Sequence, residues 1–198
     1  MARTDSVFYG PYAIRVMRIA GAHQAQIFRG RVTIGPRHHG AAPDEALEAA
    51  KIWLDRRAEV EARVRATTHI PSVEAYREAL SVIEINAAET AMLDAHIAAP
   101  RHTLTATQLA EAAGWDSWSS ANLHYGLLGR KIAEAMRWTP PLRPDGTEIW
   151  TMAIATGPHD IEGGAEIDMA GLLATYENGG QFEWVVRPQL VEALTGSA

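Results

Sequence analysis

Cysteine is absent from the 198-residue chain, which excludes both a disulfide framework and a thiolate zinc site. Long apolar runs are absent as well. No stretch approaches the roughly 18 apolar residues that a membrane-spanning helix needs, and the first residues lack the apolar core of a signal peptide. We therefore expect a soluble, cytoplasmic protein without a membrane partner.

Sequence motifs of common catalytic sites are also missing. The chain has no Gly-x-Ser-x-Gly elbow and no Gly-x-x-x-x-Gly-Lys phosphate loop. Among its eight histidines, His38 and His39 are adjacent, so their rings point in different directions. His96 lies two residues from Asp94, a spacing that does not share a helix face. We expect structural or surface roles for the histidines, and therefore no enzyme, no metal site and no cofactor.

Charge is distributed unevenly along the chain. The net charge is −6, but residues up to Ala66 hold 11 Lys and Arg against 7 Asp and Glu, a net of +4, while the rest holds 7 against 17, a net of −10. A polyanion would be attracted to the first part and, on average, repelled by the second. With 47% apolar residues, the chain is long enough for one large or two small domains.

Alternating apolar residues predict a small antiparallel sheet at the start of the chain. The expected strands cover residues 8–19, 23–28 and 31–34. A helix should begin at Pro43, because proline suits a first helical turn and acidic residues follow it. These elements form an expected basic β-β-(β)-α domain of residues 1–66.

Arginines are frequent in this first domain. Arg15, Arg29 and Arg31 are candidates for contacts with phosphate or acidic groups. The alternative is that exposed strand positions in a protein rich in arginine and poor in lysine simply carry arginine. Sequence alone leaves both interpretations open.

Residues 67–71 (TTHIP) are the expected joint to a second domain, because Pro71 cannot continue a helix. Ser72 is a good N-cap for a helix that follows the joint. Asn86 and Glu89 then form a capping box ahead of another apolar stripe. Two helices are therefore expected between the joint and Pro100.

The stretch that follows predicts a helix-turn-helix. Thr105 and Gln108 form a capping box, and Gly114 offers a left-handed stop to this short helix. A longer helix should run from about Trp118 or Ser120 to Met136. Its expected inward stripe is Leu123, Leu127, Leu128, Ile132 and Met136; its expected outer face is Asn122, Tyr125, Gly129, Arg130 and Lys131. Such a pair can place a recognition helix in the major groove, although any two packed helices share the pattern.

Strand patterns beyond these helices complete a winged-helix order. Residues 148–155 (EIWTMAIA) and 181–187 (QFEWVVR) are the expected wing strands. A glycine-rich acidic loop, residues 157–180, joins them and includes a candidate short helix at 169–176, and residues 188–194 favour a closing helical turn. The expected fold class is α+β, with a winged-helix domain of residues 67–198.

Several segments of this second domain resemble a bacterial family. They are YREAL (76–80), TATQLAEAAG (105–114), ANLHYGLLGR (121–130), RPDG (143–146) and FEWVVRPQLVEAL (182–194). Together they resemble a winged-helix-like segment of predicted HNH-type restriction endonucleases and related standalone proteins, over a little more than half the chain. The resemblance implies a non-catalytic DNA-reading module. The nuclease motif itself is absent, since there are no Cys pairs and no His-Asn-His spacing, so cleavage is not implied.

The preferred hypothesis is a non-catalytic DNA-binding protein, with reading of modified DNA as an extension. The expected contacts are Ser119, Ser120, Asn122 and Tyr125 to base edges; Arg130, Lys131, Arg15, Arg29 and Arg31 to phosphates; and Trp115 and Trp118 to a modified base. Duplex DNA is the expected partner, with a homodimer or a nuclease acting in trans as further options. The alternative hypothesis is an acidic protein-interaction module that inhibits a nucleic-acid enzyme in phage or defence biology.

Overall fold

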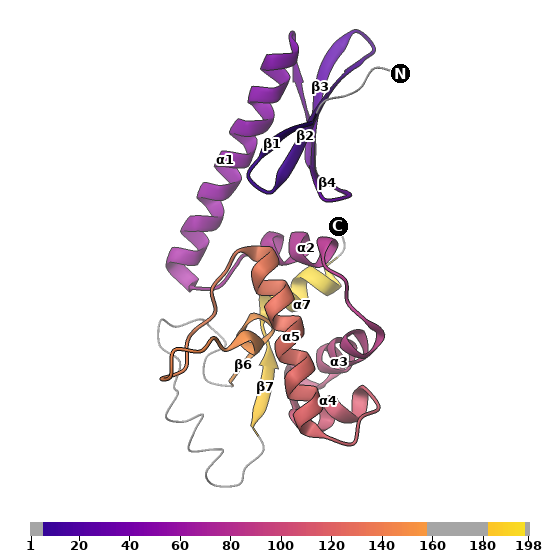
Figure 1. The fold of residues 1–198 in the computed structure, drawn as a ribbon, viewed down its shortest axis with the longest axis vertical. Coiled ribbons are helices and arrows are strands. Elements are labelled where there is room, and N and C mark those ends of the chain that lie inside the picture. The colour runs from indigo at the N-terminus through magenta and orange to yellow at the C-terminus, as the bar shows by residue number, and fades with distance from the viewer. Residues whose placement is uncertain (1–5, 158–181, 197–198) are drawn as a thin grey trace. The chain divides into compact units, whose positions relative to one another are not determined.

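The computed structural model describes residues 6–157 and 182–196. These residues form a mixed α+β chain that divides into two compact units, Met1–Arg63 and Val64–Ala198. Figure 1 shows the sheet of the first unit and the helices of the second. The expected α+β class is confirmed at this level, and none of the helices in the described ranges combines the length and apolar character needed to cross a bilayer.

The first unit is an antiparallel meander of four strands followed by a long helix (Figure 1). Its elements are β1 (Ser6–Tyr9), β2 (Tyr12–Ile19), β3 (Ala22–Arg29), β4 (Val32–Gly40) and α1 (Pro43–Thr68). Two-residue turns join the strands, and each turn contains a glycine with positive φ, an angle that glycine adopts without steric cost. The last residues of α1, from Val64 on, belong to the second unit.

The sequence prediction missed one strand and shortened another. Residues 8–19 are not a single strand, because Gly10, with φ of 57°, and Pro11 form a turn between β1 and β2. β4 continues to Gly40 through a register shift near Gly35, whose φ is 65°. A proline at position 36 concealed this continuation, since proline interrupts a regular strand pattern.

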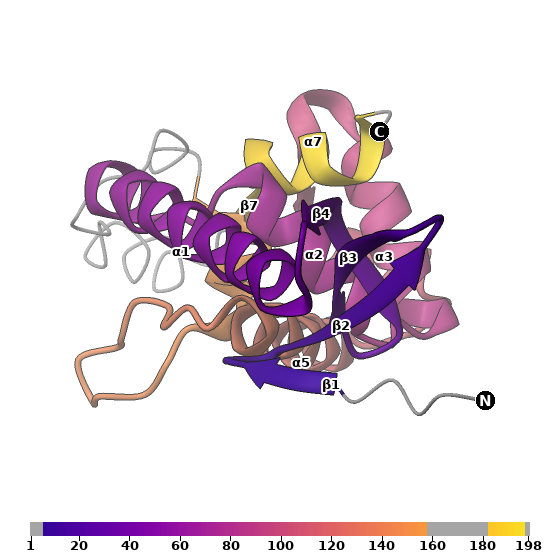
Figure 2. The ribbon, with the colours of Figure 1, turned by 90° about the horizontal axis from the view of Figure 1, so that it is seen from above.

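Alternation along the strands gives this unit a core between the sheet and α1. Figure 2 shows the first turns of α1 next to the strands. The buried residues are Ile14, Ala25, Ile27 and Ile34 from the strands and Ala46, Ala50 and Leu54 from α1. Because successive strand residues point to opposite faces, the residues between them in β2 and β3 lie on the outer face of the sheet.

The second unit is mainly helical and holds a small three-stranded sheet. Its helices are α2 (Val73–Val82), α3 (Ala87–Ala98), α4 (Ala106–Ala112), α5 (Trp118–Met136) and α7 (Pro188–Thr195), with 3-10 turns η1 (Pro100–His102) and η2 (Trp150–Ala153). Its strands are β5 (Thr103–Thr105), β6 (Ala155–Thr156) and β7 (Glu183–Val186), antiparallel in the order β5-β7-β6.

The predicted helix starts are confirmed by their hydrogen bonds. The Ser72 side chain accepts from the backbone N–H of Ala75, which caps α2. The two predicted capping boxes begin α3 and α4, and Gly114 follows α4 with φ of 73°. The capping residues and Gly114 therefore predicted these helix boundaries correctly.

Helix α5 is the central element of the second core. It packs on α2, α3, α4 and η2, and its buried residues meet apolar side chains from all of them. The largest fully buried side chains of this unit are Tyr76, Met92, His96, Leu109, Tyr125, Leu128, Ile132, Met152, Ile154 and Leu190. The Tyr76 hydroxyl donates to the carbonyl of Ala153 at 2.8 Å, so this core also binds η2 by a hydrogen bond.

The prediction of a strand over residues 148–155 is wrong for most of its length. The segment forms η2, and only Ala155 begins a strand, the two-residue β6. The reason is its packing on α5, where Gly129 leaves room for the backbone carbonyl of Trp150. The strand at 181–187 is confirmed as β7, and the helix at 188–194 as α7. The loop at 157–180, with its candidate helix at 169–176, lies outside the described residues except for Gly157.

Candidate nucleic-acid interface

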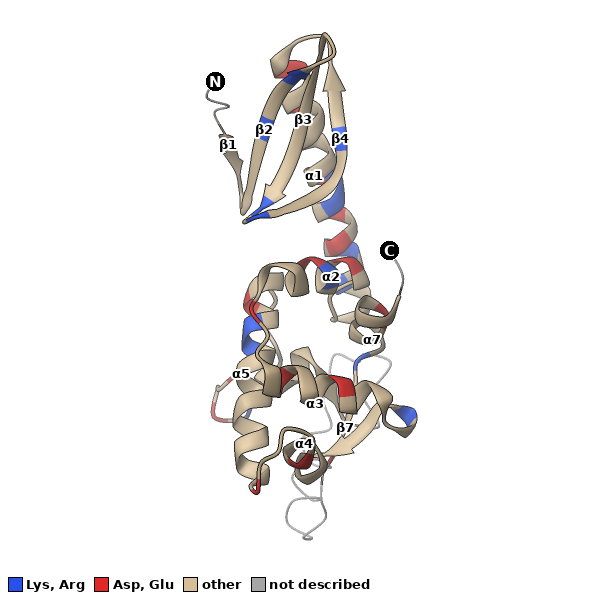
Figure 3. Ribbon diagram, turned by 90° about the vertical axis from the view of Figure 1, so that its right-hand side faces the viewer, with Lys and Arg blue, Asp and Glu red and all other residues tan. Residues whose placement is uncertain are grey.

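The sheet of the first unit is free of acidic residues. No Asp or Glu occurs from Ser6 to Pro43, whereas this stretch carries Arg15, Arg18, Arg29, Arg31 and Arg37 together with His23, His38 and His39. All acidic residues in the described part of the first unit lie on α1 (Figure 3). The charge count over residues 1–66 concealed this separation, because it averaged a cationic sheet with a mixed-charge helix.

One face of this sheet packs on α1, and the other face points away from that helix. Strand register identifies the residues of the outer face. Arg15 is paired with Ser6 and Gln26, Ala13 with Phe8 and Phe28, and Met17 with Gln24. The outer face therefore combines aromatic rings and a cation, whereas Gln26 on this face is buried. Aromatic rings and cations are groups that contact bases and phosphates in nucleic-acid complexes.

Arg15 and two phenylalanines are the most distinctive side chains on this face. The Arg15 guanidinium lies 4.7 Å from the centroid of the Phe28 ring, and its Nε donates to the Ser6 hydroxyl at 3.2 Å. Phe8 is 78% exposed, the largest exposed fraction among the large apolar side chains of the described residues. The stacked guanidinium keeps further N–H donors for a ligand, since Nε is only one of its five.

The three arginines predicted as candidates for phosphate contacts do not share a face. Arg15 lies on the outer face, but Arg29 is paired with Val32 and alternates with Phe28, so its register position is on the α1 side. Arg31 is exposed in the turn that joins β3 to β4. The three arginines therefore do not form one cluster, because alternation along the strands places Arg15 and Arg29 on opposite faces of the sheet.

The predicted outer face of α5 is also partly wrong. Tyr125, expected at base edges, is 1% exposed, and Gly129 is buried against η2. Leu123 and Leu127, expected in the core, are 61% and 45% exposed. Leu128, Ile132 and Met136 are buried as predicted. The apolar side chains alone did not predict the inner face of α5, because Tyr125 and Gly129 occupy core positions beside Leu128.

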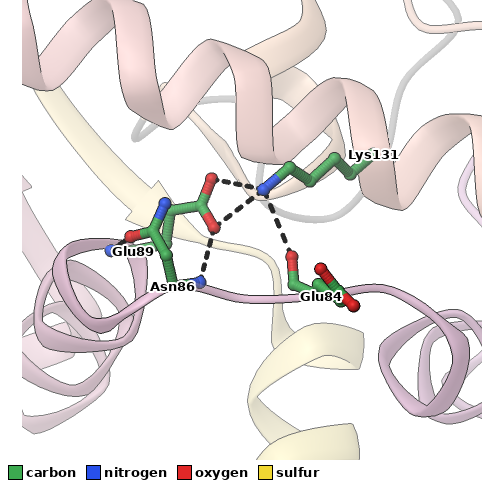
Figure 4. Close-up of polar contacts among 4 residues, drawn as sticks. All are labelled: Glu84, Asn86, Glu89 and Lys131. Atoms are coloured by element: carbon green, nitrogen blue, oxygen red, sulfur yellow. Dashed lines mark hydrogen bonds and ion pairs between the residues drawn. The ribbon is translucent and has the colours of Figure 1, made fainter.

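The two predicted phosphate cations of α5 are engaged with carboxylates. Lys131 Nζ lies 2.7 and 2.9 Å from the two carboxylate oxygens of Glu89 and 3.2 Å from the carbonyl of Glu84 (Figure 4). Glu89 is 2% exposed and also accepts from the backbone N–H of Asn86. Arg130 Nε is 2.7 Å from Glu134 in an exposed pair. Lys131 therefore joins α5 to the start of α3, while the Arg130 pair is a weak surface interaction.

The remaining predicted contacts lie at the start of α5. Ser119 is exposed, its Oγ 2.7 Å from that of Ser117, and Ser120 and Asn122 are partly buried. Trp118 is 52% exposed. Trp115 is partly buried and packs on the core, with its ring centroid 4.7 Å from that of His124. Among the predicted tryptophan contacts, Trp118 therefore offers more of its surface to a ligand.

Clusters of metal-binding side chains do not occur in the described ranges, where no three His, Asp or Glu residues come close enough to hold an ion. His96 has a structural environment, as predicted, since it is fully buried with both ring nitrogens hydrogen-bonded.

Comparison with known proteins assigns no family, since no family model, no curated protein and no solved structure matches the chain. The resemblance to segments of HNH-type restriction endonucleases therefore stays a prediction.

Proposed function

We propose that this protein is a non-catalytic nucleic-acid-binding protein and that the outer face of the β1–β4 sheet is its main contact surface. The observation that carries the proposal is the charge separation of the first unit. Five arginines and no acidic residue occupy the stretch from Ser6 to Pro43, and its outer face exposes Phe8 and Arg15. A surface of this kind attracts phosphates without opposing carboxylates, and phosphate contacts supply most of non-specific nucleic-acid affinity.

For the second unit we propose a winged-helix arrangement. Its support is the order α3, β5, α4, α5, β6, β7 with a sheet in the order β5-β7-β6, where the strand before α4 joins the two strands that follow α5. Ser119, Ser120 and Asn122 stay candidates for base contacts at the start of α5. The exposed Leu123 and Leu127 favour a secondary role for the rest of this helix, because aliphatic side chains carry little information about base edges.

The acidic interaction module is the second candidate function. It is favoured by the same two exposed leucines on α5 and by the charge of the second unit, which holds 8 Lys and Arg against 17 Asp and Glu. Apolar side chains within an acidic surface suit a basic protein partner better than a phosphate backbone. Under this hypothesis, Leu123→Ser would abolish capture of that partner and leave nucleic-acid binding unchanged.

A salt titration of the full chain tests the preferred proposal. Fluorescence anisotropy with duplex and single-stranded DNA should show binding at low salt that weakens as salt rises. Arg15→Ala should weaken binding about 3- to 10-fold and reduce the salt slope by about one. Arg56→Ala removes an equal charge from an exposed position of α1 and serves as the matched control. Absence of binding to any nucleic acid at low salt would reject the proposal.

A further inference from the structure

Phe8, Ala13 and Phe28 lie side by side on three adjacent strands. Phe8 is directly opposite Ala13 in the β1–β2 pair, and Ala13 is directly opposite Phe28 in the β2–β3 pair. All three therefore belong to one row across the outer face of the sheet. The central member of the row carries only a methyl group, so the row consists of two aromatic residues with a small residue between them.

Sheet geometry gives the size of this gap. Neighbouring strands are about 4.8 Å apart, so the backbones of Phe8 and Phe28 are separated by roughly 10 Å. A planar ring placed above Ala13 would lie one strand spacing, roughly 5 Å, from the backbone position of each phenylalanine. This spacing is comparable to the 4.5–7 Å range of centroid distances for interacting aromatic rings. Phe8 at 78% exposed has most of its surface available for such a contact.

The chemistry around the gap favours a planar group attached to an anion. Arg15 follows Ala13 by two positions on β2, and its guanidinium lies against the Phe28 ring. No carboxylate occurs in any of the four strands. A nucleobase is a planar group attached through a sugar to a phosphate. One nucleotide can therefore place its base in the gap and its phosphate against Arg15. Bases within a duplex are stacked on each other and do not present a free face.

We propose that the row formed by Phe8, Ala13 and Phe28 binds an unpaired nucleobase, with Arg15 holding the neighbouring phosphate. This inference rests on the proposed function and adds to it the form of the ligand, a single-stranded rather than a fully paired nucleic acid. Stacking supplies most of the affinity for the base, and because every base has an aromatic face, the binding has little sequence preference.

Three fluorescein-labelled ligands of equal length test the inference with the full chain at low salt. They are an oligothymidine 12-mer, the same strand paired with oligoadenine, and a 12-mer of abasic units with the same number of phosphates. Stacking of one base contributes roughly 1–3 kcal/mol, which corresponds to about 5- to 150-fold tighter binding of oligothymidine than of the abasic strand. The duplex should also bind less tightly than oligothymidine.

Variants locate the base. Phe8→Ala should reduce oligothymidine binding toward the abasic level, and Ala13→Leu should do the same by filling the gap while both rings and every charge remain. Ile52→Ala, an exposed apolar position on α1, is the control and should change nothing. Thermal unfolding by circular dichroism checks that Ala13→Leu is folded.

The outcomes separate the two proposals. Equal binding of oligothymidine and the abasic strand would overturn the base-binding row while leaving the phosphate-binding sheet intact. Normal oligothymidine binding by folded Ala13→Leu would overturn the location of the base. Binding of none of the three ligands would overturn the proposed function itself.

Discussion

The Tyr125 hydroxyl lies at a hydrogen-bonding distance of 2.7 Å from Nδ1 of His96 in the interior of the second unit. The other ring nitrogen, Nε2, lies 2.8 Å from the carbonyl oxygen of Trp184, which can only accept a hydrogen bond. Burial lowers the pKa of His96 to about 4, so at neutral pH the ring is neutral with its proton on Nε2, and Nδ1 accepts from the Tyr125 hydroxyl. This pair of hydrogen bonds ties α5, α3 and β7 together and explains why Tyr125 does not reach a ligand.

Stability should fall as the pH drops from about 6.5 to about 4. Burial lowers the pKa of His96 to about 4 in the folded chain, whereas histidine in an unfolded chain titrates near 6.5. Between these values only the unfolded chain binds the proton, so acid favours unfolding. The expected loss across this window is roughly 3 kcal/mol in the free energy of unfolding, measured by urea titration at several pH values.

The matched variant for this prediction is His96→Gln. It lacks the buried imidazole, so it should be less stable at pH 7 but should lose less stability between pH 6.5 and pH 4. Parallel pH profiles for wild type and variant would show that His96 does not cause the acid sensitivity.

Loss of Lys131 should destabilise the fold. Glu89 is 2% exposed, and Lys131→Met would leave its carboxylate buried without a cation. Removing one partner of a fully buried pair costs about 3–5 kcal/mol, and we expect about 2 kcal/mol here, because Lys131 is 40% exposed and partly solvated. Arg130→Met, which breaks an exposed pair on the same helix, should change stability much less, because an exposed ion pair contributes little. Equal effects of the two variants on urea unfolding would contradict this assignment.

Gly129 should not tolerate a larger residue. A Cβ at this position would lie 2.1 Å from the carbonyl oxygen of Trp150, so Gly129→Ala must displace η2 from α5. We expect destabilisation of at least about 2 kcal/mol, comparable to overpacking in a core. At Gly126, one helical turn earlier, the nearest atom to a Cβ is Thr151 Oγ1 at 3.8 Å, an ordinary contact. Gly126→Ala should therefore stabilise the chain by up to about 1 kcal/mol through helix propensity. Thermal melts of the two variants should move in opposite directions, and a common direction would refute the packing described for η2.

The sequence was informative wherever a local signal determines structure. Capping residues placed the starts of α2, α3 and α4, because the hydrogen bonds involved span only three residues. The predictions failed where contacts with residues far away in the sequence determine the local structure. Residues 148–155 have a strand-like composition but fold as η2, because Gly129 on α5 accommodates the Trp150 carbonyl.

The candidate site shows the same division. Residues 6–43 contain no Asp or Glu, and this absence is visible in the sequence. A charge count over residues 1–66 does not show it, because the count includes the acidic residues of α1. The row of Phe8, Ala13 and Phe28 requires the register of three strands, which depends on the turn at Gly10. Because that turn was not predicted, Phe8 and Ala13 were assigned to one strand and their cross-strand pairing was missed.

Chemical-shift mapping by nuclear magnetic resonance is the most direct test of the sheet as the nucleic-acid surface. Titration of the labelled full chain with an oligothymidine 12-mer should shift the signals of Phe8, Ala13, Arg15 and Phe28 most strongly. Signals from the exposed side of α5, such as those of Leu123 and Leu127, should change little. Shifts concentrated on α5, with the outer face of the β1–β4 sheet unaffected, would contradict the account.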